Sequence, residues 1–78
     1  MINLKNWKLG KCYNYAREVE PLNQDGHEYK EYNMNEDGLC YIGRSFVTVT
    51  DGDENILSFI IDGYDTMYGA SMKLIWKG

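Results

Sequence analysis

The chain has 78 residues, of which 44% are hydrophobic and 26% charged, and its formal net charge is −4. This length allows one domain, residues 1–78, and a composition with a single proline is typical of a globular chain rather than of a disordered linker. The longest apolar run, residues 59–61, is too short to span a membrane, and the first twenty residues lack the apolar stretch of a secretory signal. We therefore expect a cytoplasmic protein that does not act in a membrane.

Four Asp-Gly pairs, at residues 25–26, 37–38, 51–52 and 62–63, divide the chain. Asp hydrogen-bonds its own backbone in turns and Gly adopts positive φ, so each pair predicts a reversal between strands. The predicted strands span residues 8–18, 28–34, 39–50, 56–62 and 71–77. The fold class is thus all-β, or α+β if one segment is helical, with a five-stranded antiparallel meander in a single small domain.

The first two predicted strands leave alternatives open. In residues 8–18, Tyr13 and Tyr15 share a side with Lys11 and Arg17, so alternation assigns no buried face. Residues 26–35 fit either a strand or two turns of helix, because Tyr29 and Tyr32 are three positions apart. The stretch between the last two strands could hold one further helical turn.

The third and fourth strands have the clearest alternation. Val47 and Val49 lie opposite Phe46 and Thr48, and Gly43 predicts a bulge or bend earlier in the third strand. In the fourth strand, apolar residues fall on both sides: Leu57, Phe59 and Ile61 on one, Ile56 and Ile60 on the other. We therefore expect the fourth strand to be central and buried on both faces.

The last strand and the start of the chain suggest how the sheet closes. Met72, Leu74 and Trp76 are predicted to share one face. The opening "WKLGKCYNY", residues 7–15, has a hydrophobe, a Gly three residues later and then alternating hydrophobes, and it resembles the first strand of SH3-like small barrels. The resemblance implies a sheet curled into a barrel, with the last strand beside the first, and implies no function. Five strands in a chain of this length could equally form an OB-like barrel or an open curled sheet.

The acidic stretch 51–65 does not fit an EF-hand. Asp51 and Asp53 alternate, but hydrophobic residues fill the later ligand positions of such a loop, so Asp51, Asp53 and Glu54 are interpreted as a solvated turn rather than a metal site. Only three side chains, those of His27, Cys12 and Cys40, offer nitrogen or sulfur ligands for zinc, and a structural zinc site normally uses four such ligands.

Catalytic chemistry is not predicted either. A lone histidine gives no Ser/His/Asp or Cys/His arrangement, and no phosphate-binding glycine motif is present. The two cysteines are expected to be reduced and partly buried. We therefore expect a protein that is not an enzyme and that uses no cofactor and no metal.

Charge is distributed unevenly along the chain. All twelve acids lie between residues 18 and 65, where only Lys30 and Arg44 oppose them, so this segment carries −10 and the two ends carry +6. Tyrosines are interspersed among the acids, and tyrosine is enriched in protein interfaces. The predicted partner-binding surface comprises Glu28, Tyr29, Glu31, Tyr32, Asp51, Asp53, Glu54, Tyr64 and Asp65.

Such a surface predicts a non-catalytic binding module for a basic protein partner. The general character of the chain suggests an inhibitor from a phage or another mobile element that occupies a basic, nucleic-acid-binding groove. The alternative is a small barrel that binds oligonucleotides or small anions through its first and last strands, by phosphate attraction and base stacking. The residues of this alternative site are Lys8, Lys11, Tyr13, Arg17 and Lys73. A net negative charge makes nucleic acid the less favoured partner, and a homodimer is a third possibility.

Overall fold

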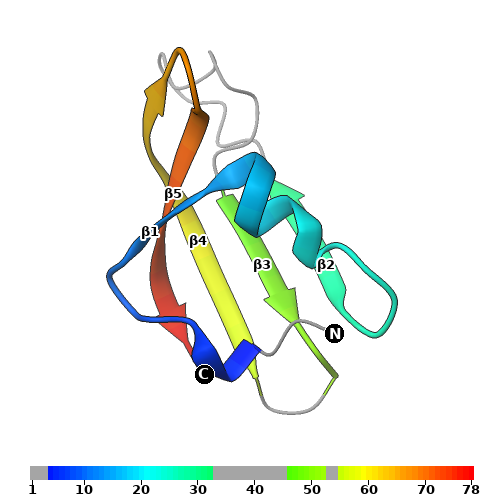
Figure 1. Ribbon diagram of the computed structural model, residues 1–78. Coiled ribbons are helices and arrows are strands. Elements are labelled where there is room, and N and C mark those ends of the chain that lie inside the picture. Colours follow the sequence, from blue (N-terminus) through cyan, green and yellow to red (C-terminus); the bar gives the residue numbers. More distant parts are fainter. Residues whose placement is uncertain (1–3, 33–45, 53–54) are drawn as a thin grey trace.

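The computed structural model describes residues 4–32, 46–52 and 55–78, which form a mostly β domain with three short helical segments (Figure 1). The helical segments are η1 (Leu4–Asn6), η2 (Tyr15–Val19) and η3 (Glu20–Leu22). The strands are β1 (Cys12–Asn14), β2 (Glu28–Tyr32), β3 (Phe46–Thr50), β4 (Ile56–Asp65) and β5 (Gly69–Lys77). The prediction of an all-β domain with five strands is confirmed.

All five strands belong to one antiparallel sheet with the order β1-β5-β4-β3-β2. The expected neighbourhood of the first and last strands is confirmed by the pairing of Cys12 with Lys73. The sheet is not closed, however, because β1 and β2 are its two edges. The resemblance to SH3-like barrels therefore extends to five antiparallel strands but not to a closed barrel.

The connection from β1 to β2 explains the open sheet. The predicted strand 8–18 ends at Asn14, whose side-chain oxygen accepts a hydrogen bond from the Arg17 amide while its own amide donates to the Glu18 carboxylate, each at 2.8 Å. This reciprocal pair caps the helical segment that begins at Tyr15, as a capping box does. The segments η2 and η3 then cross one face of the sheet (Figure 1), so the chain covers that face instead of joining β1 to β2.

The core lies between this covered face and the helical segments. Its fully or nearly fully buried residues are Leu4, Tyr13, Val19, Leu22, Val47, Val49, Leu57, Phe59, Met72 and Leu74. Trp7 packs against Phe59 and Tyr13 with ring centroids 5.5 and 4.4 Å apart. Each large aliphatic or aromatic side chain buried here contributes roughly 1.5–3 kcal/mol. The predicted alternation in β3 is confirmed, since Val47 and Val49 are buried while Phe46 and Thr48 are only half-buried.

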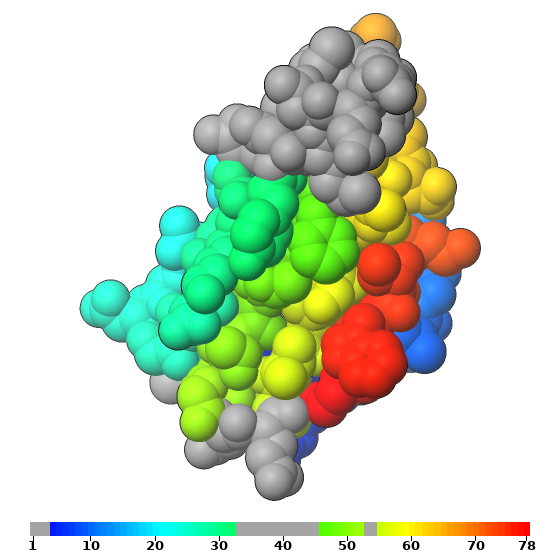
Figure 2. Space-filling model, turned by 180° about the vertical axis from the view of Figure 1, so that it is seen from behind, coloured from blue at the N-terminus to red at the C-terminus, as the bar shows by residue number. Residues whose placement is uncertain are grey.

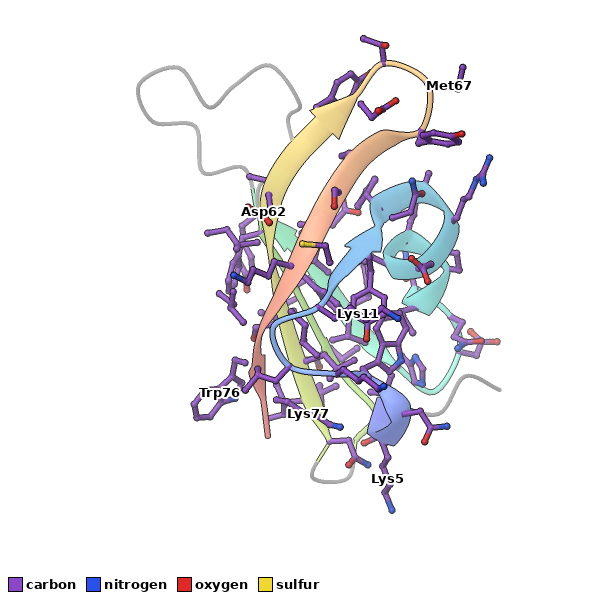
Figure 3. All side chains as sticks on the ribbon, turned by 60° about the vertical axis from the view of Figure 1, so that its left-hand side comes forward. Lys5, Lys11, Asp62, Met67, Trp76 and Lys77 are labelled. Atoms are coloured by element: carbon purple, nitrogen blue, oxygen red, sulfur yellow. The ribbon has the colours of Figure 1, made fainter. Side chains whose placement is uncertain are left out.

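A β-bulge near the end of β5 overturns the predicted placement of Trp76. Phe59 pairs with Leu74 but Ser58 pairs with Trp76, so Ile75 is an extra residue in β5. One extra residue shifts the following side chains to the other face. Trp76 consequently lies on the face opposite the helical segments (Figure 3), where it is 60% exposed.

The same bulge places Lys77 on the covered side of the sheet, opposite Leu57. Its ammonium group donates hydrogen bonds to the carbonyl oxygens of Lys5 at 2.8 Å and Trp7 at 2.7 Å. These carbonyls lie at the end of η1, where a positive charge is favourable. The last strand thus fixes the start of the chain, and the two basic ends of the sequence meet.

The Asp-Gly pairs gave mixed results. Residues 51–52 lie in the turn between β3 and β4, with Gly52 at φ +87°, whereas residues 25–26, with Gly26 at φ +90°, lie between η3 and β2 and join no paired strands. Residues 62–63 instead lie inside β4, where Gly63 at φ +125° accompanies a register shift between Ile61 and Tyr64. That pair makes a bulge rather than a reversal, because positive φ also suits an extra residue in a strand. Residues 37–38 and Gly43 are outside the described residues.

Three further predictions were wrong or only partly right. The helical alternative for residues 26–35 fails because Glu28–Tyr32 is a strand, and the expected helical turn between the last strands is a hairpin turn. β4 is central, as predicted, but it is fully buried on one face only. Ile56 is exposed and Ile60 half-buried, since no described element covers the second face. We call this second face the open face (Figure 2).

Candidate protein-binding surfaces

In the structure, the residues of the predicted acidic, tyrosine-rich surface lie on different faces and at different ends of the sheet. Glu28 and Tyr32 point to the open face of the edge strand β2, whereas Tyr29 and Glu31 point to the covered face. Asp51 lies at one end of β4 and Asp65 at the other, about 30 Å apart for ten residues of strand. Asp53 and Glu54 are outside the described residues. The predicted residues therefore do not form one contiguous patch.

Tyr29 and Glu31 belong to a polar cluster under η2 rather than to a free surface. The hydroxyl of Tyr29 donates to Oε1 of Glu31 at 2.7 Å, and the hydroxyl of Tyr15 donates to the same oxygen. Desolvation and the bond to Glu31 raise the pKa of both tyrosines well above the usual 10. Both phenols thus remain neutral donors, and the cluster attaches η2 to the edge strand β2.

Tyr64 and Asp65 lie on a hairpin formed by the far ends of β4 and β5. The described pairing of β3 with β4 ends at Phe46 and Ile60, whereas β4 and β5 continue to pair as far as Asp65 and Gly69. We call residues 62–70 the hairpin arm. It rises at one end of the sheet (Figure 1) and carries Met67 at its tip (Figure 3).

The tip of the hairpin arm exposes large side chains. Tyr64, Met67 and Tyr68 are 58%, 78% and 56% exposed. The predicted partner-binding surface includes Tyr64 but neither Met67 nor Tyr68, because the Asp-Gly pair at 62–63 predicts that the chain reverses before them. The usable signal was Asp65 followed by Gly69, with a three-residue loop, residues 66–68, between two strands.

Hydrogen bonds fix the backbone beneath these side chains. One carboxylate oxygen of Asp65 accepts from the amides of Met67 at 2.7 Å and Tyr68 at 3.1 Å, which is an Asx-type turn. The side-chain amide of Asn14 donates to the Tyr68 carbonyl at 2.7 Å, and the Arg17 guanidinium lies 5.8 Å from the Tyr68 ring centroid. The exposed tip is therefore held in one shape by β1 and η2.

The residues of the alternative anion-binding site are only partly together. Lys8, Lys11 and Lys73 are exposed near β1, but Arg17 lies beside the hairpin arm. Tyr13 is 7% exposed, and its hydroxyl accepts a hydrogen bond from the Lys8 amide at 2.8 Å. Its ring packs with Trp7 and Phe59 in the core and has no free face on which a base could stack.

Cys12 is exposed on the open side of β1, where its thiol donates to the Asp62 carboxylate at 3.1 Å. This bond, reinforced by desolvation and the negative charge of Asp62, raises the pKa of the thiol. The thiol is therefore less reactive than an ordinary cysteine at neutral pH. The expectation of a partly buried Cys12 is wrong, and Cys40 is outside the described residues.

Among the described residues, no three His, Cys, Asp or Glu side chains are grouped so that they could hold a metal ion. Within the same ranges, no helix has the length and apolar character needed to cross a membrane.

No protein-family model matches the chain, and neither curated proteins nor solved structures show significant similarity to it. The hairpin arm and the open face are thus the two surfaces from which function can be argued.

Proposed function

We propose that this protein is a non-catalytic binding module that engages a protein partner through its hairpin arm. The observation that carries the proposal is the tip itself, where Tyr64, Met67 and Tyr68 are each more than half exposed on a backbone fixed by Asp65 and Asn14. Tyrosine and methionine are enriched in interfaces, and a preformed loop loses little conformational entropy on binding. Exposed side chains of this size have no evident role in the stability of the domain.

The charges of the arm favour a basic partner. Asp62 and Asp65 lie on either side of Tyr64 in the sequence of the arm, and the whole chain carries −4. Acidic groups beside apolar side chains suit a groove with a positively charged rim and an apolar floor, and they accelerate association with it. A groove that normally binds nucleic acid has this character, and an inhibitor from a phage or mobile element is the biological role that we propose on these grounds.

Site-specific photo-crosslinking in the source cells tests the proposal. A photoreactive amino acid replaces Met67 in one variant and Leu9 in a control, since Leu9 is similarly exposed, at 63%, but lies in the loop before β1. We expect one discrete adduct from position 67 and none from position 9. Adding Tyr68→Ala should weaken the adduct at least tenfold, as loss of an interface hot spot does.

Two results would contradict the proposal. One is the absence of any adduct from position 67, and the other is the same adduct from positions 67 and 9. The basic character of the partner has its own measurement: complex formation should fall as salt rises from about 0.05 to 0.5 M, because screening weakens charge attraction. An interaction insensitive to salt would retain the arm as the site but exclude a basic groove.

A further inference from the structure

We propose that the open face is the interface of a homodimer in which two copies of the chain pack sheet against sheet. The face is made of three rows of paired residues that cross β2, β3, β4 and β5. The first row is Tyr32, Phe46, Ile60 and Lys73; the second is Lys30, Thr48, Ser58 and Trp76; the third is Glu28, Thr50 and Ile56. This inference does not depend on the hairpin arm.

The distribution of charge on the open face is that of an interface. The outward residues of β3 and those of β4 from Ile56 to Ile60 are all apolar or hydroxyl-bearing. Charged side chains surround this centre, with the Glu28–Lys30 ion pair on β2, Lys73 on β5, and Asp62 beyond Ile60 on β4, where it accepts a hydrogen bond from the Cys12 thiol. Depletion of charge in the centre and a charged rim distinguish protein interfaces from ordinary surface.

The distribution of large and small side chains on the open face favours a second copy of the chain as its partner. Large side chains stand on β5, where the bulge places Trp76, whereas β3 offers the small Thr48 in the same row. β3 and β5 are the two neighbours of β4. A two-fold axis parallel to β4 therefore sets Trp76 of each copy over Thr48 of the other, which is self-complementary.

The positions of the lysines on the open face also favour a two-fold axis parallel to β4. With the axis parallel to β4, Lys73 of one copy lies over the Phe46 ring of the other, a favourable cation–π arrangement. A two-fold axis perpendicular to the strands would instead set Lys30 against Lys30 and Trp76 against Trp76. Aligned packing of two sheets about 10 Å apart has the form of a β-sandwich and is a common arrangement.

The size of the face predicts a weak dimer. Four strands about 4.8 Å apart, each rising about 3.4 Å per residue over about five residues, give a projected face of roughly 330 Å² per copy. Two such faces bury less than the roughly 1,200–2,000 Å² of a standard interface, so we expect a weak complex with a Kd on the order of 10 µM. Because the axis runs along the strands, both hairpin arms would leave the dimer at the same end, available for two-point binding.

Light scattering and sedimentation equilibrium over a range of concentrations test the dimer. We expect the mass to rise from 9.1 kDa towards 18.2 kDa, twice the mass of one chain. Thr48→Arg and Trp76→Lys should each raise the Kd at least thirtyfold without changing the circular dichroism spectrum. The matched control is Thr66→Arg, since Thr66 is an exposed threonine of the hairpin arm and should leave the Kd unchanged.

Each remaining outcome overturns the inference. A wild-type chain that stays at 9.1 kDa up to 1 mM excludes a second copy as the occupant of the open face. A dimer that persists in both Thr48→Arg and Trp76→Lys uses another surface. Photo-crosslinking from position 67 is expected with or without dimerisation, so failure of the dimer and failure of the binding arm are distinguishable.

Discussion

We predict that removing the hydroxyl group of Tyr15 or of Tyr29, which both bind Glu31, destabilises the fold. Both hydroxyls donate to Oε1 of Glu31, so Tyr15→Phe or Tyr29→Phe leaves a half-buried carboxylate with one donor fewer. A hydrogen bond to a charged group contributes about 1.5–3 kcal/mol when buried, and partial solvation here reduces this to about 1 kcal/mol. In a domain of this size, such a loss lowers Tm by about 4–8 °C.

The two tyrosines also predict how stability depends on pH. Desolvation and the bond to Glu31 raise the pKa of both phenols above the usual 10 in the folded state. A raised folded-state pKa means that the folded chain keeps protons which the unfolded chain releases. The stabilisation is therefore complete below pH 10 and is lost as pH rises above it, and the double variant Tyr15→Phe/Tyr29→Phe should show a flatter alkaline decline.

Urea unfolding at pH 7 and at several values between 9 and 11 measures both effects. Tyr64→Phe is the control, because the Tyr64 phenol is 58% exposed on the hairpin arm and its loss should change the free energy of unfolding by less than about 0.3 kcal/mol. The reasoning is refuted if the double variant declines with pH as steeply as the wild type. It is equally refuted if Tyr15→Phe and Tyr29→Phe behave like Tyr64→Phe.

Three further changes test other parts of the fold. Lys77→Met removes the ammonium group that binds two carbonyls at the end of η1, and chemical denaturation should show a loss of about 1 kcal/mol, with hydrogen exchange faster in residues 4–8. Asp65→Ala should raise hydrogen exchange at the amides of Met67 and Tyr68 while changing Tm by no more than a few degrees, since the turn is exposed. Phe59→Ala empties the centre of the core and should cost about 3–5 kcal/mol, which calorimetry would record as a Tm lowered by at least about 12 °C.

Whether an Asp-Gly pair marked a hairpin depended on whether its glycine lies in a turn or in a β-bulge. Asp51-Gly52 lies between β3 and β4, which can pair only by reversing there, whereas Asp25-Gly26 lies between η3 and β2 and reverses no pair of strands. Asp62-Gly63 has the same local chemistry, but β4 continues through it to pair with β5. Positive φ is compatible with a turn and with a bulge, and only the available partner strand selects between them. The tip residues Met67 and Tyr68 were missed for this reason.

The sequence by itself determined the number of strands, their antiparallel pairing and much of the buried face. Alternation in Val47 and Val49 is a local property of an extended chain, and it survives any arrangement of the strands. The cap at Asn14 was also readable in principle, since its partner Glu18 is only four positions away.

Tertiary structure alone decided where the sheet ends, which face stays open and where Trp76 points. An extra residue at Ile75 inverts every following side chain, and a bulge forms only where two particular strands pair. The candidate surfaces depend on these choices, because the helical segments cover one face while no described element covers the open face or the tip of the hairpin arm. Local sequence fixes which residues can be strands, whereas long-range pairing fixes which of their side chains meet a partner.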